Sequence, residues 1–343
     1  MATIKDVARV SGVSIKTVSR VVNDQADVSS ETRQKVQQAI LELGYQPNTT
    51  ARSLVNGRTN TVGVIIPHSA DYIFTHPFFT EVLRGIAEVL SENNFNLLLH
   101  LAHDQAPYVR LYSQRKVDGL ILMSIPLGDP NLEGLEQSEA PYVCTCRISE
   151  DDASANWVDA DFAGGVEQAM EHLISLGHRR IALLTGPMSL VSVRLRVRGY
   201  QNALQSHHLP ATAGYVLEGN FTSESGHALA VQAMQHSSPP SALICGDDMM
   251  AFGAMQALKE LGYRVPEDVS VIGFDDVSLA RFSSPPLTTI RQDTYQKGRI
   301  AAKTLLDLIR GKSNPVPTQI MLETSLISRS STAPVKSSEP HVP

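Results

Sequence analysis

The sequence predicts two unlike parts, a small α-helical head and a larger α/β body built from two lobes. Three observations predict them. Residues 3–45 place apolar side chains at helical spacing between Ser/Thr caps and glycines. From Thr61 to Ser328, short β-branched runs alternate with amphipathic stretches, a pattern typical of parallel sheets covered by helices. About 270 residues are too many for one small open sheet, so we expect two similar lobes.

The composition is that of a globular protein, with 42% hydrophobic and 19% charged residues. No apolar run approaches the roughly 20 residues of a membrane span. The first residues, "MATIKDVARV", lack the basic stretch and apolar core of a secretion signal. Three cysteines in 343 residues make no disulfide framework. We therefore expect a cytoplasmic protein with no membrane partner.

Charge is distributed unevenly along the chain. The net charge of −6 would by itself argue against nucleic-acid binding. Residues 1–58, however, hold eight Lys and Arg against five Asp and Glu, a balance of +3, which leaves −9 for the remainder. This asymmetry favours a basic module on an acidic body, although a small excess can also arise by chance.

The head has the order of residues that a helix-turn-helix requires. Such a motif needs a small residue where its helices cross, a residue that tolerates positive φ in the turn, and an apolar residue on the second helix. Ala8, Gly12 and Val18 meet these requirements in that order. Ser14 is placed to cap the second helix, and Ser29 the third.

The second helix leaves a polar and basic face uncovered. A helix fits the major groove of DNA, where Lys and Arg donate to guanine edges, while hydroxyl and amide groups bond phosphate oxygens. A small structural bundle with a solvated outer face is the alternative, because this spacing is only moderately specific. The residues that we expect on a DNA-binding surface here are Ser14, Ile15, Lys16, Thr17, Arg20, Asn23, Ser29 and Thr32.

Two segments lack the residues for a core. The stretch between Pro47 and Gly57 is polar and could form one short helix, Thr49 to Val55, which would be marginal alone. The end of the chain, "SSTAPVKSSEPHVP", is polar and Pro-rich. We expect it to be disordered, with no heptad pattern to drive further assembly.

The body is expected to bind a ligand between its lobes, because open α/β sheets bind ligands at the carboxyl ends of their strands. Asp275 follows the strand "VSVIG", and Asp247 follows "ALICG". Carboxylates suit sugar hydroxyls and aromatic rings suit sugar C–H faces, so Phe221, His76 and Phe78 are further candidates. An N-cap role is the alternative for Asp247, and ordinary core packing is the alternative for Phe221.

Several motifs together resemble one family. In the head they are "TIKDVARVSGVSIKTVSRVVN", "VSSETRQKVQQAILELGYQPN" and "ARSL"; in the body they include "VDGLIL", "GHRRIALLTGP", "RVRGYQNAL" and "PPLTTIRQD". This order resembles the LacI/GalR family of bacterial transcriptional repressors, from Ala2 to Arg329. The resemblance implies a helix-turn-helix head and a hinge helix, joined to a two-lobed core like that of periplasmic binding proteins.

The resemblance also implies roles for head and hinge residues. Ile15, Lys16 and Arg20 would face bases, although Ile15 offers only an apolar contact, as to a thymine methyl, where a polar residue is often found. The polar segment after the head would hold a hinge helix that orders on operator DNA and includes Ala51 and Leu54. Leu54 would wedge into a minor-groove step; a linker leucine packed on its own lobe is the alternative.

In the body the resemblance implies an effector site with Asp275 as a hydroxyl acceptor and Arg196 able to hold two oxygens. One departure concerns "YVCTCRIS", where Cys146 stands in place of the Asp found before Arg in many relatives. Arg147 remains a candidate, but one expected acceptor is missing, so the ligand cannot be inferred by analogy. Cys144 and Cys146 are predicted to be buried structural cysteines, not a metal or redox pair.

We predict no catalytic set, cofactor or metal site, because the sequence lacks a phosphate-binding loop and a nucleophile elbow. We predict a homodimeric, sequence-specific DNA-binding regulator, a repressor of a pseudo-palindromic operator, controlled by a sugar or sugar derivative between its lobes. A periplasmic-type sugar-binding protein is the alternative, disfavoured by the head and the missing signal peptide. The predicted segments are the helix-turn-helix domain 1–46, the hinge and linker 47–60, the two-lobed domain 61–329 and the disordered tail 330–343.

Overall fold

The computed structural model describes residues 2–22, 25, 27–46, 58–101, 108–149, 154–312 and 316–335. The chain divides into two compact units, Met1–Thr59 and Asn60–Pro343. The boundary falls inside the predicted linker. Residues 47–57, which include the predicted hinge helix, lie outside the described residues.

The head is a three-helix domain, as predicted, with α1 (Ile4–Ser11), α2 (Ile15–Val22) and α3 (Ser30–Leu43). Gly12 ends α1 with a φ of 69°, in the left-handed region that glycine adopts readily. Ser29 caps α3, because its Oγ accepts a hydrogen bond from the N–H of Thr32. The buried core of the head consists of Val7, Ala8, Val18, Val21, Val36 and Ala39.

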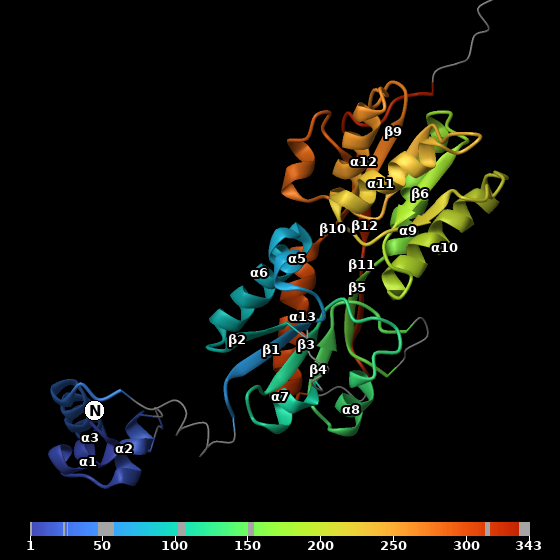
Figure 1. Ribbon diagram of the computed structural model, residues 1–343. Helices are drawn as coiled ribbons and strands as arrows, with labels where there is room; N and C mark the ends of the chain where they lie inside the picture. The colour runs from blue at the N-terminus through green and yellow to red at the C-terminus, as the bar shows by residue number, and fades with distance from the viewer. Residues whose placement is uncertain are drawn as a thin grey trace, which may run out of the picture. The chain divides into compact units, whose positions relative to one another are not determined.

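The body consists of two α/β lobes, each with one six-stranded sheet (Figure 1). The first sheet is parallel throughout, in the order β2-β1-β3-β4-β5-β11. Its strands are β1 (Thr61–Ile66), β2 (Asn96–Leu101), β3 (Gly119–Leu122), β4 (Tyr142–Cys144), β5 (Trp157–Ala160) and β11 (Gln319–Leu322).

The second sheet has the order β7-β6-β8-β9-β10-β12, with only its edge strand β12 antiparallel. The common order of the two sheets confirms the expectation of two similar lobes. The strands are β6 (Ile181–Thr185), β7 (Val216–Glu218), β8 (Ala242–Cys245), β9 (Ser270–Asp275), β10 (Thr288–Gln292) and β12 (Thr324–Ile327).

Helices cover both faces of each sheet. In the first lobe α6 and α13 pack on one face and α7 and α8 on the other; in the second lobe α9 and α10 lie opposite α11 and α12. The helices of the body are α5 (Ala70–Thr75), α6 (Pro77–Glu92), α7 (Val109–Ser113), α8 (Asn131–Gln137), α9 (Phe162–Ser175), α10 (Val191–Ser206), α11 (Ser223–Met234), α12 (Asp248–Glu260), the 3₁₀ turn η1 (Ser278–Arg281) and α13 (Thr294–Ile309).

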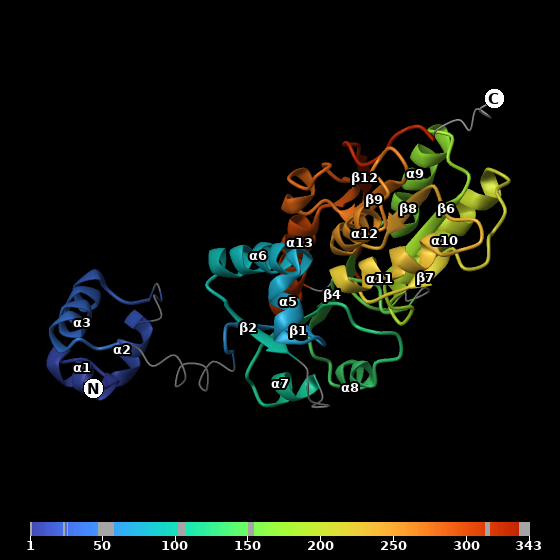
Figure 2. The ribbon, with the colours of Figure 1, turned by 45° about the horizontal axis from the view of Figure 1, so that its top comes forward.

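Two glycines bring α6 and α13 into close contact, and the helices lie side by side in both ribbon views (Figures 1 and 2). A Cβ on Gly298 would lie 2.1 Å from the carbonyl oxygen of Val82. A Cβ on Gly85 would lie 2.2 Å from that of Tyr295. Side chains larger than glycine would force these helices apart, so the close packing of α13 on α6 depends on glycine at both positions.

The chain passes between the lobes three times, each time through one residue. Asp161 joins β5 to α9, Asp293 joins β10 to α13, and Glu323 joins β11 to β12. Asp161 and Asp293 also cap the helices that follow them. The carboxyl ends of both sheets therefore face the region between the lobes, where the sequence places the candidate ligand residues.

The predicted tail begins too early. Residues 330–343 were expected to be disordered, but Ser331 is fully buried. Its Oγ donates to the carbonyl of Val271 (2.6 Å) and accepts from the N–H of Thr288 (2.8 Å). The N–H of Val335 donates to the carbonyl of Leu176. Small polar side chains here satisfy backbone groups of the second lobe, so order extends through residue 335.

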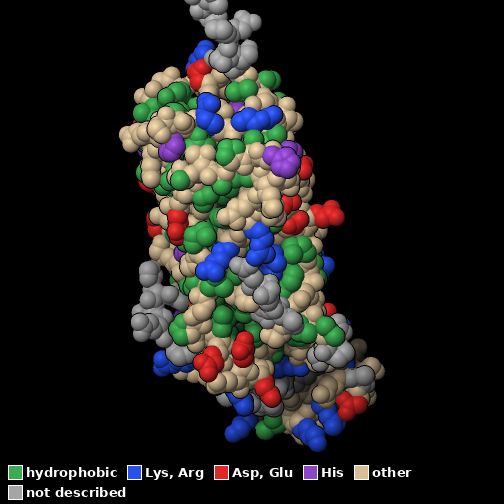
Figure 3. Space-filling model, turned by 90° about the vertical axis from the view of Figure 1, so that its right-hand side faces the viewer, with side chains coloured by type: hydrophobic (Ala, Val, Ile, Leu, Met, Phe, Trp, Pro, Cys, Tyr) green, Lys and Arg blue, Asp and Glu red, His purple; other side chains and the backbone are tan. Residues whose placement is uncertain are grey.

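On the face shown in Figure 3, basic, acidic and hydrophobic side chains of the body are interspersed, and neither charge covers it continuously. This face therefore offers no broad basic surface for nucleic acid. No helix among the described residues is both long and apolar enough to cross a membrane.

Candidate functional site

The outer face of α2 is exposed, as the sequence predicts. Ile15 is 46% exposed and Lys16 is exposed, whereas Val18 and Val21 face the core and are buried. Ile15 therefore leaves an apolar side chain on this exposed face. The helix thus presents the predicted residues outward while its opposite side holds the head together.

Several of the predicted contacts have partners within the head, among them Ser14 and Arg20. Ser14 caps α2: its Oγ accepts from the N–H of Thr17 (3.1 Å) and lies 2.8 Å from the Thr17 hydroxyl. The Arg20 guanidinium lies 3.1 Å from the carboxylate of Asp27, and both side chains are substantially exposed. Such exposed pairs are weak, so Arg20 can leave Asp27 for DNA at little cost.

Three other predicted DNA contacts, Asn23, Ala51 and Leu54, lie outside the described residues. Their roles stay predictions.

A cavity between the lobes contains all seven of the predicted effector residues. Its lining atoms surround about 660 Å³ of empty space, including open solvent at the mouth. The predicted residues that line it are His76, Phe78, Arg147, Arg196, Phe221, Asp247 and Asp275.

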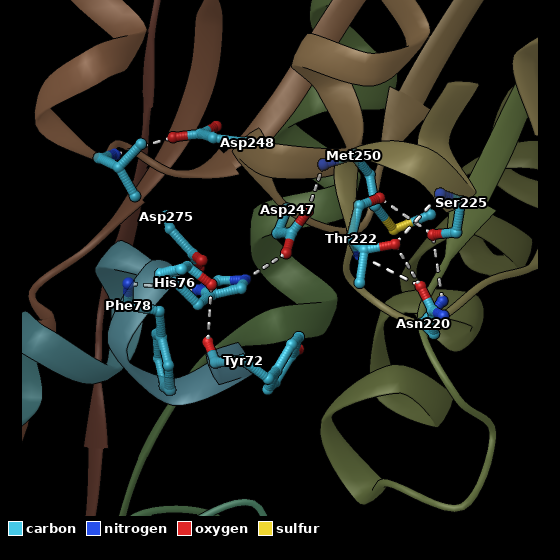
Figure 4. Close-up of polar contacts among 12 residues, drawn as sticks. Tyr72, His76, Phe78, Asn220, Thr222, Ser225, Asp247, Asp248, Met250 and Asp275 are labelled. Carbon is cyan, nitrogen blue, oxygen red and sulfur yellow. Dashed lines mark hydrogen bonds and ion pairs between the residues drawn. The ribbon is translucent and has the colours of Figure 1, made fainter. Parts of the chain in front are cut away.

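Asp247 has the N-cap role that the sequence left open as the alternative, and it also lines the cavity. Its Oδ1 accepts from the N–H of Met250 (2.7 Å), which caps α12. Its Oδ2 lies 2.8 Å from Nε2 of His76, which belongs to the first lobe and begins α6. Figure 4 shows these two side chains pointing toward one another, with Asp275 beside them. The contact therefore crosses the cavity and joins the lobes.

Burial by itself would lower the pKa of His76. The hydrogen bond to Asp247 and the charges of Asp247 and Asp275 outweigh burial and raise this pKa above its usual value. The imidazolium form of His76 is therefore favoured beside the two carboxylates.

Asp275 ends β9 in an unusual backbone conformation, with a φ of 106°. Such conformations cost about 1–3 kcal/mol and concentrate at functional sites. The Gln292 amide donates to Oδ1 of Asp275. Burial raises the pKa of Asp275 to about 6, and the nearby charge of Arg196 opposes this rise. The carboxylate is therefore ionised at neutral pH but close to protonation.

Asp248 holds the loop that presents Asp275. This fully buried carboxylate accepts from the N–H of Val277 (2.8 Å) and from the Thr289 hydroxyl (2.5 Å). Burial raises its pKa well above the usual value. Asp248 was not among the residues predicted from the sequence, although it follows Asp247 directly.

Arg196 extends into the cavity from α10 between aromatic rings. Its guanidinium carbon lies 4.2 Å from the ring centre of Phe162, 4.3 Å from that of Phe274 and 5.7 Å from that of Phe221. The Nε of Arg196 is buried and has no hydrogen-bond partner among the described residues. A buried donor without a partner is costly, so this atom is suited to bind a ligand oxygen.

Phe221 both lines the cavity and packs against the core of the second lobe, so the two interpretations of this residue are compatible. Its ring occupies the space that a Cβ on Gly186 would need, only 2.2 Å from the ring. Phe78 also lines the cavity, as does the buried Phe79 beside it.

The sequence analysis missed part of the polar lining, above all Lys297 and Gln292. The Lys297 amine donates to Oε1 of Gln292 (3.0 Å) and lies 3.5 Å from the carboxylate of Asp159. That carboxylate also accepts from the backbone N–H of Arg147 and lies 3.3 Å from its Nε. Only the buried position of Asp159 near the end of β5 and the position of Gln292 as the last residue of β10 could have indicated these residues.

Cys146 lines the cavity beside Arg147, whereas Cys144 is buried in the core of the first lobe. Burial raises the pKa of Cys146 to about 11, so this thiol is neutral at pH 7. Cys144 is buried as predicted, whereas Cys146 is only partly buried and lies beside Arg147, at the position where the resemblance implied a ligand group. Among the described residues, no cluster of His, Cys, Asp and Glu could hold a metal ion.

Comparison with known proteins places both parts in one family. The pattern described as "Bacterial regulatory proteins, lacI family" matches residues 3–48, and the "Periplasmic binding protein-like domain" matches residues 170–332. The HTH-type transcriptional regulator CelR of Thermobifida fusca is 36% identical over 333 residues, which cover 96% of this chain and 98% of CelR. The chain belongs to the lacI family of bacterial regulatory proteins.

Two solved structures of lacI-family regulators extend the likeness to the fold. One is a transcriptional regulator CelR–cellobiose complex, with 34% identity and a TM-score of 0.76, over 96% of this chain and 100% of that one. The other is the lac repressor dimer bound to operator and the anti-inducer ONPF, with 31% identity and a TM-score of 0.86, over 97% and 99%. As a lacI-family member, this chain is a DNA-binding transcriptional regulator.

Proposed function

We propose that the chain is a homodimeric repressor of a pseudo-palindromic operator, whose operator affinity changes when a sugar or sugar derivative fills the cavity between its lobes. One combination carries this proposal: an exposed α2 face in the head, and a body cavity lined by carboxylates, Arg196 and aromatic rings. The solved relatives support it, since one is bound to cellobiose and another is a dimer bound to operator.

In this proposal the head contacts bases through Ile15, Lys16 and Arg20. Phosphate contacts come from the hydroxyl and amide groups of Ser14, Thr17, Asn23, Ser29 and Thr32. The segment 47–60 forms the hinge, with Ala51 and Leu54 in the minor groove.

The effector hydroxyls donate to Asp247 and Asp275, while Arg196 and Arg147 donate to effector oxygens. Phe78 and Phe221 pack against its C–H faces, and His76 closes the cavity from the first lobe. These assignments use groups that already converge on one space.

The cavity is coupled to the head through the relative position of the lobes. A ligand that bonds both lobes favours one arrangement of them, and this arrangement favours or disfavours the ordered hinge. A coupling free energy of about 1–3 kcal/mol would change operator affinity by roughly 5- to 150-fold. Either sign, induction or corepression, is possible with the same parts.

We infer that the protein acts in the cytoplasm on the nucleoid, and that it binds its effector without converting it. The carboxylate and Arg groups of the cavity suit hydrogen bonding to hydroxyls, and membership of a family of regulators supports a binding role.

The test uses full-length protein to select duplexes from random DNA and measures their affinity by fluorescence anisotropy with and without sugars. We expect an inverted repeat to be selected, and at least one sugar to change the affinity by fivefold or more, about 1 kcal/mol. Selected DNA without two related half-sites would count against a dimeric operator. A sugar that changes DNA binding equally in wild type and in Asp275→Ala would place the effector outside this cavity.

A further inference from the structure

Lys297 places an amine inside the cavity, where burial lowers its pKa and the charges of Asp159 and Asp275 oppose that lowering. The side chain is only 1% exposed, and its amine lies 5.1 Å from the ring centre of Phe162 and 5.9 Å from that of Phe78. Its position is constrained because the next residue, Gly298, packs directly on α6. A lysine is rarely buried unless its charge is paired, so the surrounding charges decide what this one does.

The negative charge closest to Lys297 is shared with a second cation. The Asp159 carboxylate is completely buried, and Lys297 lies 3.5 Å from its Oδ1, which already accepts the N–H of Ala160 (2.9 Å). Its Oδ2 accepts from the backbone N–H of Arg147 (3.1 Å) and lies 3.3 Å from the Arg147 Nε. One carboxylate therefore serves two cations, and the contact with Lys297 is the longer one.

The other charged groups of the cavity do not balance the charge of Lys297. Arg196 is a third cation of the cavity and is itself buried, and Asp275, Asp247 and Asp159 lie within its electrostatic reach, with Asp275 the strongest. The charge of Asp247 is engaged by His76 and by the N-terminus of α12, whose N–H groups and dipole favour an anion. Among the described residues of the cavity, Lys297, Arg147 and Arg196 thus have two carboxylates between them, Asp159 and Asp275.

Cys146 adds to this imbalance. The thiol lines the cavity where the resemblance noted above would place a carboxylate, and burial raises its pKa to about 11. It is therefore neutral at pH 7. At this position the cavity therefore offers a neutral thiol and no carboxylate, with Lys297 nearby, which favours a ligand that accepts hydrogen bonds over one that donates them.

From this arrangement we propose that the effector is an anionic sugar derivative, whose carboxylate or phosphate group is bound by Lys297 together with Arg196. The proposal rests on the function proposed above and narrows its ligand class. A ligand anion supplies the missing countercharge and gives the unpartnered Nε of Arg196 an acceptor. The sugar hydroxyls remain for Asp247 and Asp275.

The test titrates full-length protein by calorimetry with matched sets of probes: glucose, gluconate, glucuronate and glucose 6-phosphate, and cellobiose with cellobionate. The variant is Lys297→Met, which keeps the length of the side chain and removes its charge. The matched control is Lys303→Met, because Lys303 lies on the same helix and is exposed. Inorganic phosphate alone controls for binding that does not depend on the sugar.

We expect at least one acid or phosphate to bind about tenfold or more tightly than its neutral parent, the usual size of a hydrogen bond to a charged group. Lys297→Met should remove this preference, and Lys303→Met should retain it. The carboxylate and phosphate probes distinguish the two sources of the anion. Neutral parents that bind as tightly as their charged derivatives would overturn the proposal, as would a preference that survives Lys297→Met.

A measurement without ligand separates binding from a structural role. If Lys297 carries an excess charge, Lys297→Met should leave the midpoint of thermal unfolding unchanged or raise it. A fall of several degrees, with the ligand preference intact, would make Lys297 a structural partner of Asp159 and overturn the proposal. Charged ligands that bind without changing operator affinity would contradict the proposed function alone. If no probe binds, both proposals fail.

Discussion

His76 and Asp247 close the cavity from opposite lobes, with Nε2 and Oδ2 2.8 Å apart and both side chains buried. Each residue stands at the N-terminus of a helix, His76 at α6 and Asp247 at α12. The pair therefore connects two rigid elements (Figure 4). The contact therefore holds the two lobes together across the cavity.

The His76–Asp247 contact should give the body a pH-dependent stability. The folded state raises the pKa of His76, so the stabilisation is complete below the unfolded value of about 6.5 and is lost as the pH rises through the folded value. Asp247→Asn removes the charge and keeps the cap. We expect Asp247→Asn to unfold at a lower temperature than wild type at pH 6, and we expect this difference to become smaller as the pH rises to 9.

Asp161→Asn is the matched control for that experiment, because Asp161 caps α9. Its effect should not follow the same pH profile. A loss for Asp247→Asn that stays constant from pH 6 to pH 9 would show that His76 does not carry a proton in this contact.

Effector binding should weaken in acid because of Asp275. Its pKa of about 6 means that the carboxylate gains a proton below that pH and accepts hydroxyl bonds poorly. We expect the dissociation constant, measured by calorimetry between pH 5 and pH 8, to rise below pH 6. Asp275→Asn should bind the effector weakly at every pH and keep near-normal operator affinity. A pH step that persists in Asp275→Asn would assign the titration to another group.

The raised pKa of Asp275 affects the stability of the protein without effector in the opposite direction: acid stabilises the fold. A carboxyl group whose pKa is raised on folding stabilises the fold below its unfolded pKa of about 3.9, and this contribution is lost as the pH rises toward the folded value. Wild type should therefore lose stability relative to Asp275→Asn between pH 4 and pH 6, as measured by thermal unfolding.

Arg20→Ala should relax base preference at one position of each half-site and cost about 1–3 kcal/mol in binding to the selected operator. Competition between operator variants in anisotropy measurements checks this. Asp27→Asn is the control, because it frees Arg20 from its partner in the head and should leave base preference unchanged. A loss that is uniform over all sequences would instead make Arg20 a phosphate contact.

The turn of the head should tolerate Asn better than Val at position 12. Gly12 has a φ of 69°, and a Cβ there would meet nothing within 4 Å, so any penalty comes from the backbone alone. We expect Gly12→Val to destabilise the head by about 1–2 kcal/mol and Gly12→Asn by less. Hydrogen exchange of the α1 and α2 amides measures the difference. Gly128→Val, at a similar φ in the body, should leave those amides unaffected.

Residues at caps and strand ends were predictable because local rules govern them. Ser29 and Gly44 bound α3 as their side chains and conformations require. Asp247 and Asp275 follow buried strands, and parallel strands bring their carboxyl ends together. The seven predicted effector residues consequently share one cavity, although the chain separates them by up to 199 positions, from His76 to Asp275.

Lys297 was not predictable in the same way. It lies within the amphipathic helix α13, where a lysine is normally solvated, and only the packing of α13 on α6 through Gly298 turns it inward. Edge strands such as β7 and β12 have three or four residues and depend on pairing with distant segments. Ser331 is ordered for the same reason, since its partners belong to β9 and β10.

The single-residue connections between the lobes limit how an effector can act. Leu322 ends one sheet and Thr324 begins the strand of the other, and two residues apart on a chain means at most about 7 Å. The lobes can rotate about these three tethers but cannot separate. A ligand in the cavity would therefore act by changing the angle between the two lobes. Parts of the first lobe that lie farther from the three connections would move farther for the same change of angle.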